Sequence, residues 1–217
     1  MSRESNKDLT RRTAKILAKL KELYPRARTA LHHRDPMQML VATILSAQCT
    51  DVRVNQVTEI LFRKYRTVAD YARVRQPALE RAIHSTGFYR NKAKNIRAAA
   101  AMIVERFGGR VPETMDELLA LPGVARKTAN CVLESAFGIS EGVTVDTHVI
   151  RLSGRLGFSK EKNAVKIERD LMALIPRSDW AAVSHLLIFH GRAVCAARKP
   201  DCDGCAVSRW CPSAFKA

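Results

Sequence analysis

The sequence lacks any long apolar run, although 47% of its 217 residues are hydrophobic. No stretch approaches the ~20 consecutive apolar residues that a membrane-spanning helix needs. The N-terminal segment MSRESNKDLTRRTAK also lacks the apolar core of a secretory signal peptide. We therefore expect a cytoplasmic protein without membrane association, with enough apolar residues for the core of one large domain or two small ones.

Acidic residues are scarce relative to basic ones. The chain has 21 Asp and Glu against 37 Lys and Arg, which gives a formal net charge of +16. Such an excess suggests a polyanionic partner, most often nucleic acid. The alternative is a basic protein whose charge serves only solubility, and the composition leaves both open.

Signals for strands and linkers are also scarce. Strand-like alternation is confined to VTVD, which is too short to build a sheet, and no Pro-, Gly- or Ser-rich linker or solenoid repeat interrupts the chain. Signals for helix starts are frequent instead, as at Asp35 before Pro36, at Thr50, and at Thr114 with the capping-box partner Glu117. These patterns predict about ten helices and an all-α fold.

Four of the six cysteines lie close together in CAARKPDCDGCAVSRWC. Disulfides are rare in the reducing cytoplasm, so clustered cysteines there more often bind metal or carry out redox chemistry. Cys49 and Cys131 lie in apolar helical segments and are interpreted as buried thiols. The clustered four have the spacing C-x6-C-x2-C-x5-C and are Cys195, Cys202, Cys205 and Cys211.

The segment LPGVARKTA lies between two predicted helices. Leu121 closes the first helix, Gly123 forms the turn with the preceding proline, and Ala125 leads into the second helix. A turn that enters a helix leaves backbone N–H groups unpaired at the positive end of the helix dipole, and this is an anion site suited to a DNA phosphate. An ordinary helical hairpin would have the same pattern, and the pattern alone favours neither.

Two ionisable residues near this hairpin are candidates for catalysis. Lys127 falls in the first turn of the second helix, where the dipole disfavours a cation, and a neutral amine can act as a nucleophile. The alternative is a solvated lysine that touches phosphate. Asp146 precedes the next predicted helix, where an aspartate is usually an N-cap. A capping carboxylate stays charged, which suits it to stabilising a developing positive charge better than to general base catalysis.

Several motifs together resemble a known family. LPGVARKTANCVLESAFG, followed after six residues by VDTHVIRL, resembles the helix-hairpin-helix, Gly/Pro-rich loop and Asp motif of base-excision DNA glycosylases. The cysteine spacing and the segments LSAQCTDVRVN, GFYRNKAKNI and LIFHGRAVCAARKPDC are similar to its endonuclease III branch. The resemblance covers residues 8–212 and implies two all-α domains that flank a DNA-binding cleft.

The resemblance also implies where each domain lies. A six-helix barrel would cover residues 29–139, with its helix-hairpin-helix at about 115–137. An iron–sulfur cluster domain would combine residues 1–28 with 140–217 and would carry the cluster loop at 195–211. Lys127 and Asp146 would then face each other across the cleft.

One [4Fe–4S] cluster per chain is the cofactor that the resemblance implies, with Cys195, Cys202, Cys205 and Cys211 as its ligands. Spacing alone does not exclude zinc, although common four-cysteine zinc sites use two C-x2-C pairs and this loop has one. The cluster would be structural and would shape a loop whose Arg198 and Lys199 meet DNA phosphates.

The activity implied is that of a bifunctional glycosylase and lyase in base excision repair. Lys127 matches the lysine that attacks C1′, expels an oxidised pyrimidine and leaves a Schiff base, after which β-elimination cuts the strand 3′ to the lesion. Asp146 matches the aspartate that supports charge at the sugar. The partner would be double-stranded DNA with oxidised pyrimidines or abasic sites, and the enzyme is expected to act as a monomer.

Besides Leu121, Gly123 and Ala125 of the hairpin, further residues match the family's DNA contacts. The damaged nucleotide must leave the base stack. Gln48 matches the residue that fills the vacated space, and Phe88 stands where an apolar wedge, often leucine, enters from the other side. Asp51 and His148 align near the lesion pocket, although His148 is equally well explained as a helix residue that satisfies a nearby acid. Many relatives have a second glycine where this chain has Ala125, which still offers its N–H to phosphate.

Two other classes of protein remain possible on the sequence. The first is a monofunctional adenine or mismatch-thymine glycosylase, but those branches generally place a different residue at the position of Lys127. The second is a non-catalytic iron–sulfur DNA-binding protein or redox sensor, and the presence of both Lys127 and Asp146 argues against it. A strand-nicking assay on a duplex with an oxidised pyrimidine separates all three.

Overall fold

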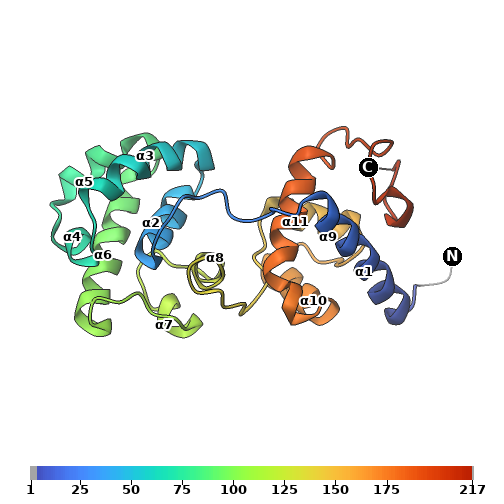
Figure 1. The fold of residues 1–217 in the computed structure, drawn as a ribbon, viewed down its shortest axis with the longest axis horizontal. Helices are drawn as coiled ribbons and strands as arrows, with labels where there is room; N and C mark the ends of the chain where they lie inside the picture. Colours follow the sequence, from blue (N-terminus) through green and yellow to red (C-terminus); the bar gives the residue numbers. More distant parts are fainter. Residues whose placement is uncertain (1–3, 217) are drawn as a thin grey trace. The chain divides into compact units, whose positions relative to one another are not determined.

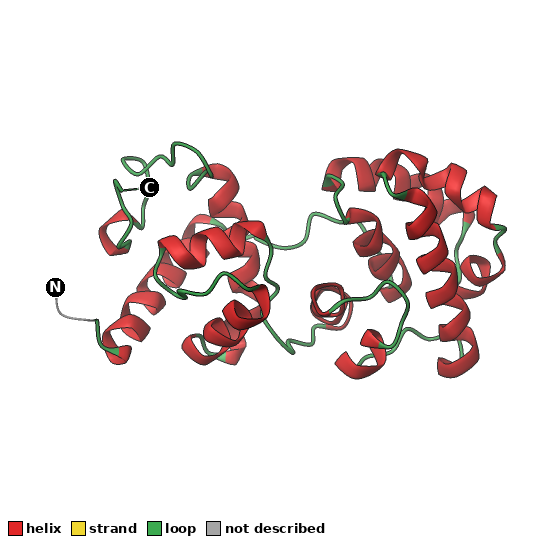
Figure 2. Ribbon diagram, turned by 180° about the vertical axis from the view of Figure 1, so that it is seen from behind, coloured by secondary structure: helices red, strands yellow, loops and turns green. Residues whose placement is uncertain are grey.

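The computed structural model describes residues 4–216, which form helices joined by turns and loops (Figures 1 and 2). The predicted all-α fold is confirmed, because the described residues contain no strand and VTVD runs as an extended loop. Between residues 4 and 216, no helix combines the length and the apolar character that a membrane crossing requires.

The chain divides into two compact units, each with its own hydrophobic core. The hairpin unit runs from Ala30 to Glu141. The cysteine unit combines the segment that ends at Thr29 with the residues from Gly142 onward. The candidate residues are therefore distributed over two separately packed bodies.

The hairpin unit is built around an apolar helix, α2, whose segment MLVATIL has no polar face to turn to water. Eight of its eleven residues are buried, and it packs against α3 and α8. The long helix α6 packs against α4 and α5, as the green ribbon in Figure 1 shows. The elements of this unit are α2 (Pro36–Ser46), α3 (Asp51–Lys64), α4 (Val68–Arg73), α5 (Gln76–Ile83), the 3₁₀ helix η1 (His84–Thr86), α6 (Tyr89–Phe107), α7 (Met115–Leu119) and α8 (Arg126–Phe137).

The cysteine unit has a core where α1 and α9 both pack against α11. Gly191 lets α9 and α11 approach closely, because a Cβ there would lie 3.0 Å from side-chain nitrogens of Arg151 and His148. After α11 the chain continues as a loop that carries the four clustered cysteines. The elements are α1 (Asn6–Leu23), α9 (Thr147–Arg155), α10 (Ala164–Leu174), η2 (Arg177–Asp179), α11 (Trp180–Ala193) and η3 (Ser208–Trp210).

Local capping explains where several helices begin. Asp35 caps α2 by accepting the Gln38 N–H at 2.8 Å, and Thr50 caps α3, as the sequence predicts. At α7, the Thr114 hydroxyl oxygen accepts the Glu117 N–H. The second bond of the predicted capping box, from the Thr114 backbone N–H to the Glu117 carboxylate, is replaced by another. The Thr114 hydroxyl donates to the Glu117 carboxylate at 2.7 Å, so the carboxylate is turned to the side chain and not to the backbone. The structure places a complete capping box at α4, between Thr67 and Asp70, which the sequence analysis missed.

Candidate nucleic-acid interface and cysteine centre

The hairpin consists of α7, a tight turn and α8. Leu121 is only 2% exposed and packs in the core, so its side chain anchors the hairpin and is not available to DNA. Its carbonyl accepts the Val124 N–H at 3.1 Å and closes the turn. Ala125 is the N-cap of α8 in extended conformation, and no side chain of the described residues caps this helix end. The first N–H groups of α8 thus lie at an exposed dipole end, as an anion site requires.

Gly123 is required at the turn for two reasons. Its φ of +79° is a conformation that residues with a side chain rarely adopt. A Cβ at this position would also lie 2.7 Å from Cβ and Nδ2 of Asn95, which belongs to α6. The hairpin therefore rests directly on α6, and the turn admits no larger residue without displacing Asn95.

Lys127 occupies the second position of α8 and is exposed to solvent. The adjacent Arg126 is half-buried. The lysine amine therefore stands at the surface of the hairpin unit, in the turn of helix that also presents the backbone N–H groups. A phosphate held by those groups would lie within one helical turn of the lysine.

Gln48 and Phe88 share an unusual backbone conformation. Their φ angles are +53° and +47°, so both are left-handed although neither is glycine. Both residues are exposed, and Phe88 is 64% accessible. Such conformations persist only where the surrounding structure imposes them, and they concentrate at functional sites. Asp51 lies half-buried in the first turn of α3, close in sequence to Gln48.

Lys92 is a buried cation that the sequence analysis did not single out. It lies on α6, is 5% exposed, and its Nζ donates to the carbonyls of Leu45 and Thr86, both at 2.8 Å. Burial lowers the pKa of Lys92, and the nearby Cys49 opposes this shift. The signal was present in the sequence, because Lys92 and Ile96 are four residues apart and so lie on the same apolar face of the helix.

In the cysteine unit, Asp146 is the N-cap of α9. Its Oδ1 accepts the Val149 N–H at 2.9 Å, so the capping role expected from the sequence is confirmed. One carboxylate oxygen makes that bond, and a carboxylate offers a second oxygen as an acceptor. The helix thus fixes the carboxylate at its positive end.

The ring of His148 is held by an arginine and not by an acid. Arg151 Nη2 lies 3.1 Å from His148 Nδ1, and because a guanidinium only donates, Nδ1 is the acceptor. Burial lowers the pKa of His148, Asp146 raises it, and Arg151 and Arg192 lower it further. The neutral ring with its proton on Nε2 is therefore the form that fits this contact.

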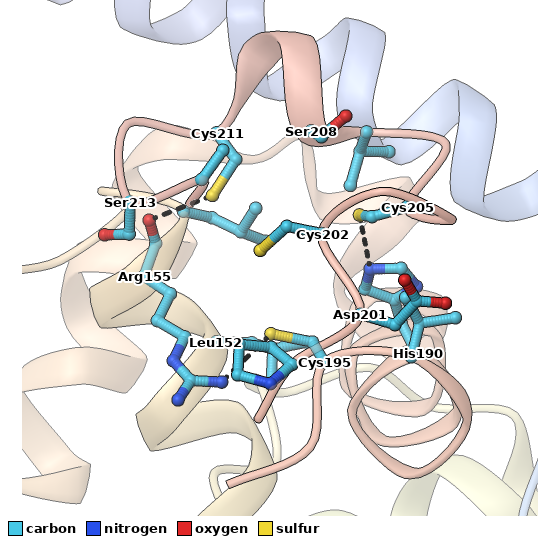
Figure 3. A pocket seen from close by; sticks show the side chains of 15 residues that line it. Leu152, Arg155, His190, Cys195, Asp201, Cys202, Cys205, Ser208, Cys211 and Ser213 are labelled. Carbon is cyan, nitrogen blue, oxygen red and sulfur yellow. Dashed lines mark hydrogen bonds between the residues drawn. The ribbon is translucent and has the colours of Figure 1, made fainter. Parts of the chain in front are cut away.

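The four clustered cysteines line one cavity between α9, the end of α11 and the loop that follows (Figure 3). All are free thiols, and their surroundings include the apolar side chains of Leu152, Leu156 and Val207. Burial raises the pKa of the Cys205 and Cys211 thiols. Among residues 4–216, no three Cys, His, Asp or Glu side chains converge closely enough to hold a single metal ion, whereas a cluster takes one thiolate at each of several iron atoms.

Two arginines on α9 hold the start of this loop. Arg155 donates from Nη1 to the Ala196 carbonyl at 2.6 Å and to Cys195 Sγ at 3.3 Å. Arg151 donates to the carbonyls of Gly191 and Cys195. The four-residue spacing places both guanidinium groups on one face of α9, which is the signal that the sequence analysis did not use.

A third support comes from α11. His190 is 2% exposed, and its Nε2 lies 3.4 Å from Cys205 Sγ. Its Nδ1 lies 3.1 Å from the hydroxyl of Tyr24, which caps the end of α1. A sulfur ligand backed by a histidine and a tyrosine is the kind of outer contact that orients metal ligands.

These observations test whether the donors fit an iron–sulfur cluster. Four thiols face one apolar cavity, and an N–H of Arg155 and a ring nitrogen of His190 lie near two of the sulfur atoms. A cluster of this type takes one thiolate per iron and is tuned by such hydrogen bonds. The residues present therefore fit the group.

The remaining candidates lie at the surface. Arg198 and Lys199 are exposed on the loop between the first two clustered cysteines, and Lys199 has a left-handed φ of +52°. Cys49 and Cys131 are half-buried against the core of the hairpin unit, so the prediction of buried thiols was wrong. Cys49 lies between α2 and α3, and Cys131 lies in the middle of α8.

Comparison with known proteins agrees with this geometry. The sequence matches the HhH-GPD superfamily base excision DNA repair protein family over residues 41–177. Endonuclease III of Synechocystis sp. is 59% identical over 203 residues, which cover 94% of this chain and 93% of the relative. A non-covalent endonuclease III–DNA complex has a similar structure, with a TM-score of 0.89 and 44% identity over 94% of this chain and 96% of that one. A trapped endonuclease III–DNA covalent intermediate matches with the same values.

Proposed function

The chain belongs to the HhH-GPD superfamily of base excision DNA repair proteins and, within it, to the endonuclease III family, and from this premise we propose how its residues act. It is a DNA glycosylase and abasic-site lyase. Its substrate is double-stranded DNA that carries an oxidised pyrimidine or an abasic site. Support comes from the similarity to endonuclease III–DNA complexes and from the net charge of +16.

Lys127 is the nucleophile in this proposal. The Nζ lone pair attacks C1′ as the bond from C1′ to the base breaks, and the base leaves with that electron pair and takes up a proton. The amine then loses protons while the sugar ring opens at O4′, which takes up a proton, so that a Schiff base joins Nζ to C1′. Loss of a proton from C2′ breaks the C3′–O bond, and the 3′ phosphate leaves.

Asp146 supports the positive charge that develops on the sugar. Its Oδ1 is fixed by the Val149 N–H, which holds the carboxylate in one orientation. A preoriented charge stabilises a transition state without the cost of reorganising at the moment of reaction. His148 and Asp51 contribute to the pocket that receives the damaged base.

DNA is held through its backbone and opened by two side chains. The N–H groups at the start of α8 bind a phosphate, with Gly123 and Ala125 shaping the turn. Arg198 and Lys199 bind further phosphates from the cysteine unit. Gln48 and Phe88 enter the duplex where the damaged nucleotide has left the stack, because their exposed side chains stand on left-handed backbone that ordinary loops avoid.

One [4Fe–4S] cluster binds to Cys195, Cys202, Cys205 and Cys211 in this proposal. When bound, it supplies iron–thiolate bonds that fix the loop and takes no part in breaking the glycosidic bond. Arg155 and His190 orient two of the sulfur ligands. The loop then presents Arg198 and Lys199 in a fixed conformation.

The observation that carries this proposal is the placement of Lys127. It is an exposed lysine in the first turn of a helix whose N-terminus has no side-chain cap among the described residues. That position places a nucleophilic amine beside the backbone N–H groups of α8 that would bind the phosphate. A monofunctional glycosylase has no need of an amine there.

Trapping with borohydride tests the assignment. Wild-type enzyme should become covalently attached to DNA containing an oxidised pyrimidine, since reduction converts the Schiff base into a stable amine. Lys127→Ala should bind the same duplex but neither trap nor nick it. Lys127→Arg is the matched control, because it keeps a long basic side chain in the first turn and cannot form the Schiff base. An adduct with either variant would mean that another amine is the nucleophile.

A further inference from the structure

Lys92 connects the two segments that carry Gln48 and Phe88. Its Nζ lies 2.8 Å from the Leu45 carbonyl, three residues before Gln48, and 2.8 Å from the Thr86 carbonyl, two residues before Phe88. We propose that Lys92 is a positioning residue that holds both DNA-entering side chains at a fixed separation. This inference rests on the proposed roles of Gln48 and Phe88.

The two carbonyls that Lys92 binds are ones that need an outside partner. Leu45 lies in the last turn of α2, and Thr86 ends η1. The last carbonyls of a helix have no partner within it. A buried carbonyl without a hydrogen bond is unfavourable, so a buried ammonium that binds two of them stabilises both helix ends at once.

The main chain of Lys92 adds a third tether. Its own N–H donates to the Phe88 carbonyl at 3.1 Å, which begins α6 directly after the left-handed residue. Phe88 is thus fixed on one side through Thr86 and on the other through the backbone of Lys92. Gln48 is fixed through Leu45 and through the Cys49 N–H, which donates to Ser46.

Both protonation states of Lys92 can make these bonds. Burial lowers its pKa, but a neutral amine still has two N–H donors, one for each carbonyl. The role therefore depends on the presence of the amine and not on its charge. A variant that keeps the length of the side chain but removes the donors addresses the role directly.

The consequence concerns the step in which a paired nucleotide leaves the stack. Two side chains that enter a duplex from both sides do so efficiently only if their loops are preorganised, because ordering a loose loop opposes binding. An abasic site has no base to extract. Loss of Lys92 should therefore impair excision of a paired damaged base and leave chemistry at Lys127 nearly intact.

The test compares Lys92→Met with Lys94→Met under single-turnover conditions. Lys94 lies on the same helix, is exposed, and its replacement makes the same change in net charge. The two substrates are a duplex with a paired oxidised pyrimidine and the same duplex with a preformed abasic site. Lys92→Met should lose about tenfold or more on the paired lesion and less than about threefold at the abasic site, because extraction of a paired base costs a few kcal/mol. Lys94→Met should change both rates by the same factor.

Equal losses of Lys92→Met on the two substrates, or none, would overturn the proposal. If Lys92→Met does not fold, Lys92→Gln carries the same test, since its shorter side chain keeps an amide donor but cannot span both carbonyls. Lys92→Arg keeps several donors and should retain the wild-type ratio of the two rates. A ratio as low as that of Lys92→Met would contradict the tether.

Hydrogen exchange separates this inference from the proposed function beneath it. In Lys92→Met, backbone amides of residues 46–49 and 86–89 should exchange faster, since the local opening free energy falls when the tether is lost. Unchanged exchange there would overturn the role of Lys92 whatever the kinetics. If exchange rises but Gln48→Ala and Phe88→Ala show no selective loss on the paired lesion, the intercalating roles fail and the tether stands.

A combined variant completes the design. In a Gln48→Ala/Phe88→Ala background, Lys92 has no DNA-entering side chain left to position. Adding Lys92→Met should then cause little further selective loss, because residues that act through one another are not additive. A full additional loss would show that Lys92 acts by another route and would count against the inference.

Discussion

At the scale of single residues, the proposed function gives Asp146 a structural and a chemical task in one carboxylate. Its Oδ1 caps α9 through the Val149 N–H, and the same bond fixes the group's orientation. An aspartate before a helix is common for capping alone. The two tasks can be separated by substitution, because an amide keeps the acceptor oxygen and removes the charge.

Asp146→Asn should fold with almost unchanged stability and lose excision activity by about 10²–10³-fold, the usual cost of removing an electrostatic contact to a transition state. Asp146→Ala should in addition lower the free energy of unfolding by about 1 kcal/mol, since it removes the cap. Urea denaturation and single-turnover excision measure the two effects. Normal excision by Asp146→Asn would leave capping as the residue's whole role.

At the scale of elements, the hairpin is fixed by what lies beneath its turn. Gly123 has a left-handed backbone and meets Asn95 of α6 at a distance that leaves no room for a methyl group. Gly108, at the end of α6, is also left-handed, with φ of +60°, but nothing lies within 4 Å of the position of its Cβ. Both glycines are therefore required by a left-handed backbone, but only Gly123 is also required because a neighbouring side chain lies against it.

Gly108→Ala should lower the free energy of unfolding by about 1–2 kcal/mol, the cost of a left-handed conformation for a residue with a side chain. Gly123→Ala should cost more, because Asn95 must also move. Only Gly123→Ala should weaken DNA binding, since the turn beside α8 is displaced. Denaturation and binding titrations on an undamaged duplex compare them, and equal effects in both assays would contradict the proposed contact with phosphate.

The cysteine loop has its own prediction. Arg198→Ala should weaken binding to many DNA sequences alike and reduce the slope of log K against log salt by about 0.9, the value for one lost phosphate contact. Arg198→Lys keeps the charge and should keep the slope. DNA-binding titrations at several salt concentrations measure this slope. A loss of affinity confined to one DNA sequence would point to a base contact instead.

Sequence patterns predicted the helices well because their start signals are local. Asp35 with Pro36, Thr50 and Asp146 each act on the backbone within three residues, so their pattern is visible without the fold. The capping box at Thr67 was equally local and was overlooked. The predicted box at Thr114 shows the limit, because the rotamer of Glu117 decides which donor its carboxylate meets.

The site was less predictable where it depends on partners distant in the sequence. Lys92 binds Leu45, 47 residues earlier, and Arg155 binds Ala196, 41 residues later. A lysine in a polar stretch such as RNKAKN gives no sign of which carbonyl it will find. The left-handed backbone of Gln48 and Phe88 was also hidden, because neither is a residue that favours that conformation.

At the scale of the whole molecule, the chain has two separate hydrophobic cores, and the candidate residues are divided between them. The hairpin unit contains Lys127, Gln48 and Phe88, while the cysteine unit contains Asp146 and the thiol cavity. In the proposed function, catalysis requires both units to act on one nucleotide. Damage to the cluster site should then affect one core directly and the other only through DNA.

Cys202→Ala should reduce the iron content from about four per chain, the count of the cluster type. It should also lower the midpoint of unfolding of the cysteine unit by at least about 5 °C, since metal binding contributes directly to folding and each kcal/mol shifts a small domain by about 4–8 °C. Cys131→Ala, a half-buried thiol of the hairpin unit, is the control and should retain its iron. Stoichiometric zinc without iron in the wild-type protein would contradict the cluster.

The single helix α6 has a consequence for how damage is found. Lys92 and Asn95 lie about one turn apart on it, so the segments that carry Gln48 and Phe88 and the turn at Gly123 all contact one helix. In the proposed function, the side chains that enter DNA and the site that binds phosphate would therefore move together with α6. Whether a base pair opens under this movement then depends on how easily the DNA deforms, and deformation is easiest where a base is damaged or mispaired. Under this arrangement a damaged nucleotide would be found because it leaves the base stack at lower energetic cost than an intact one.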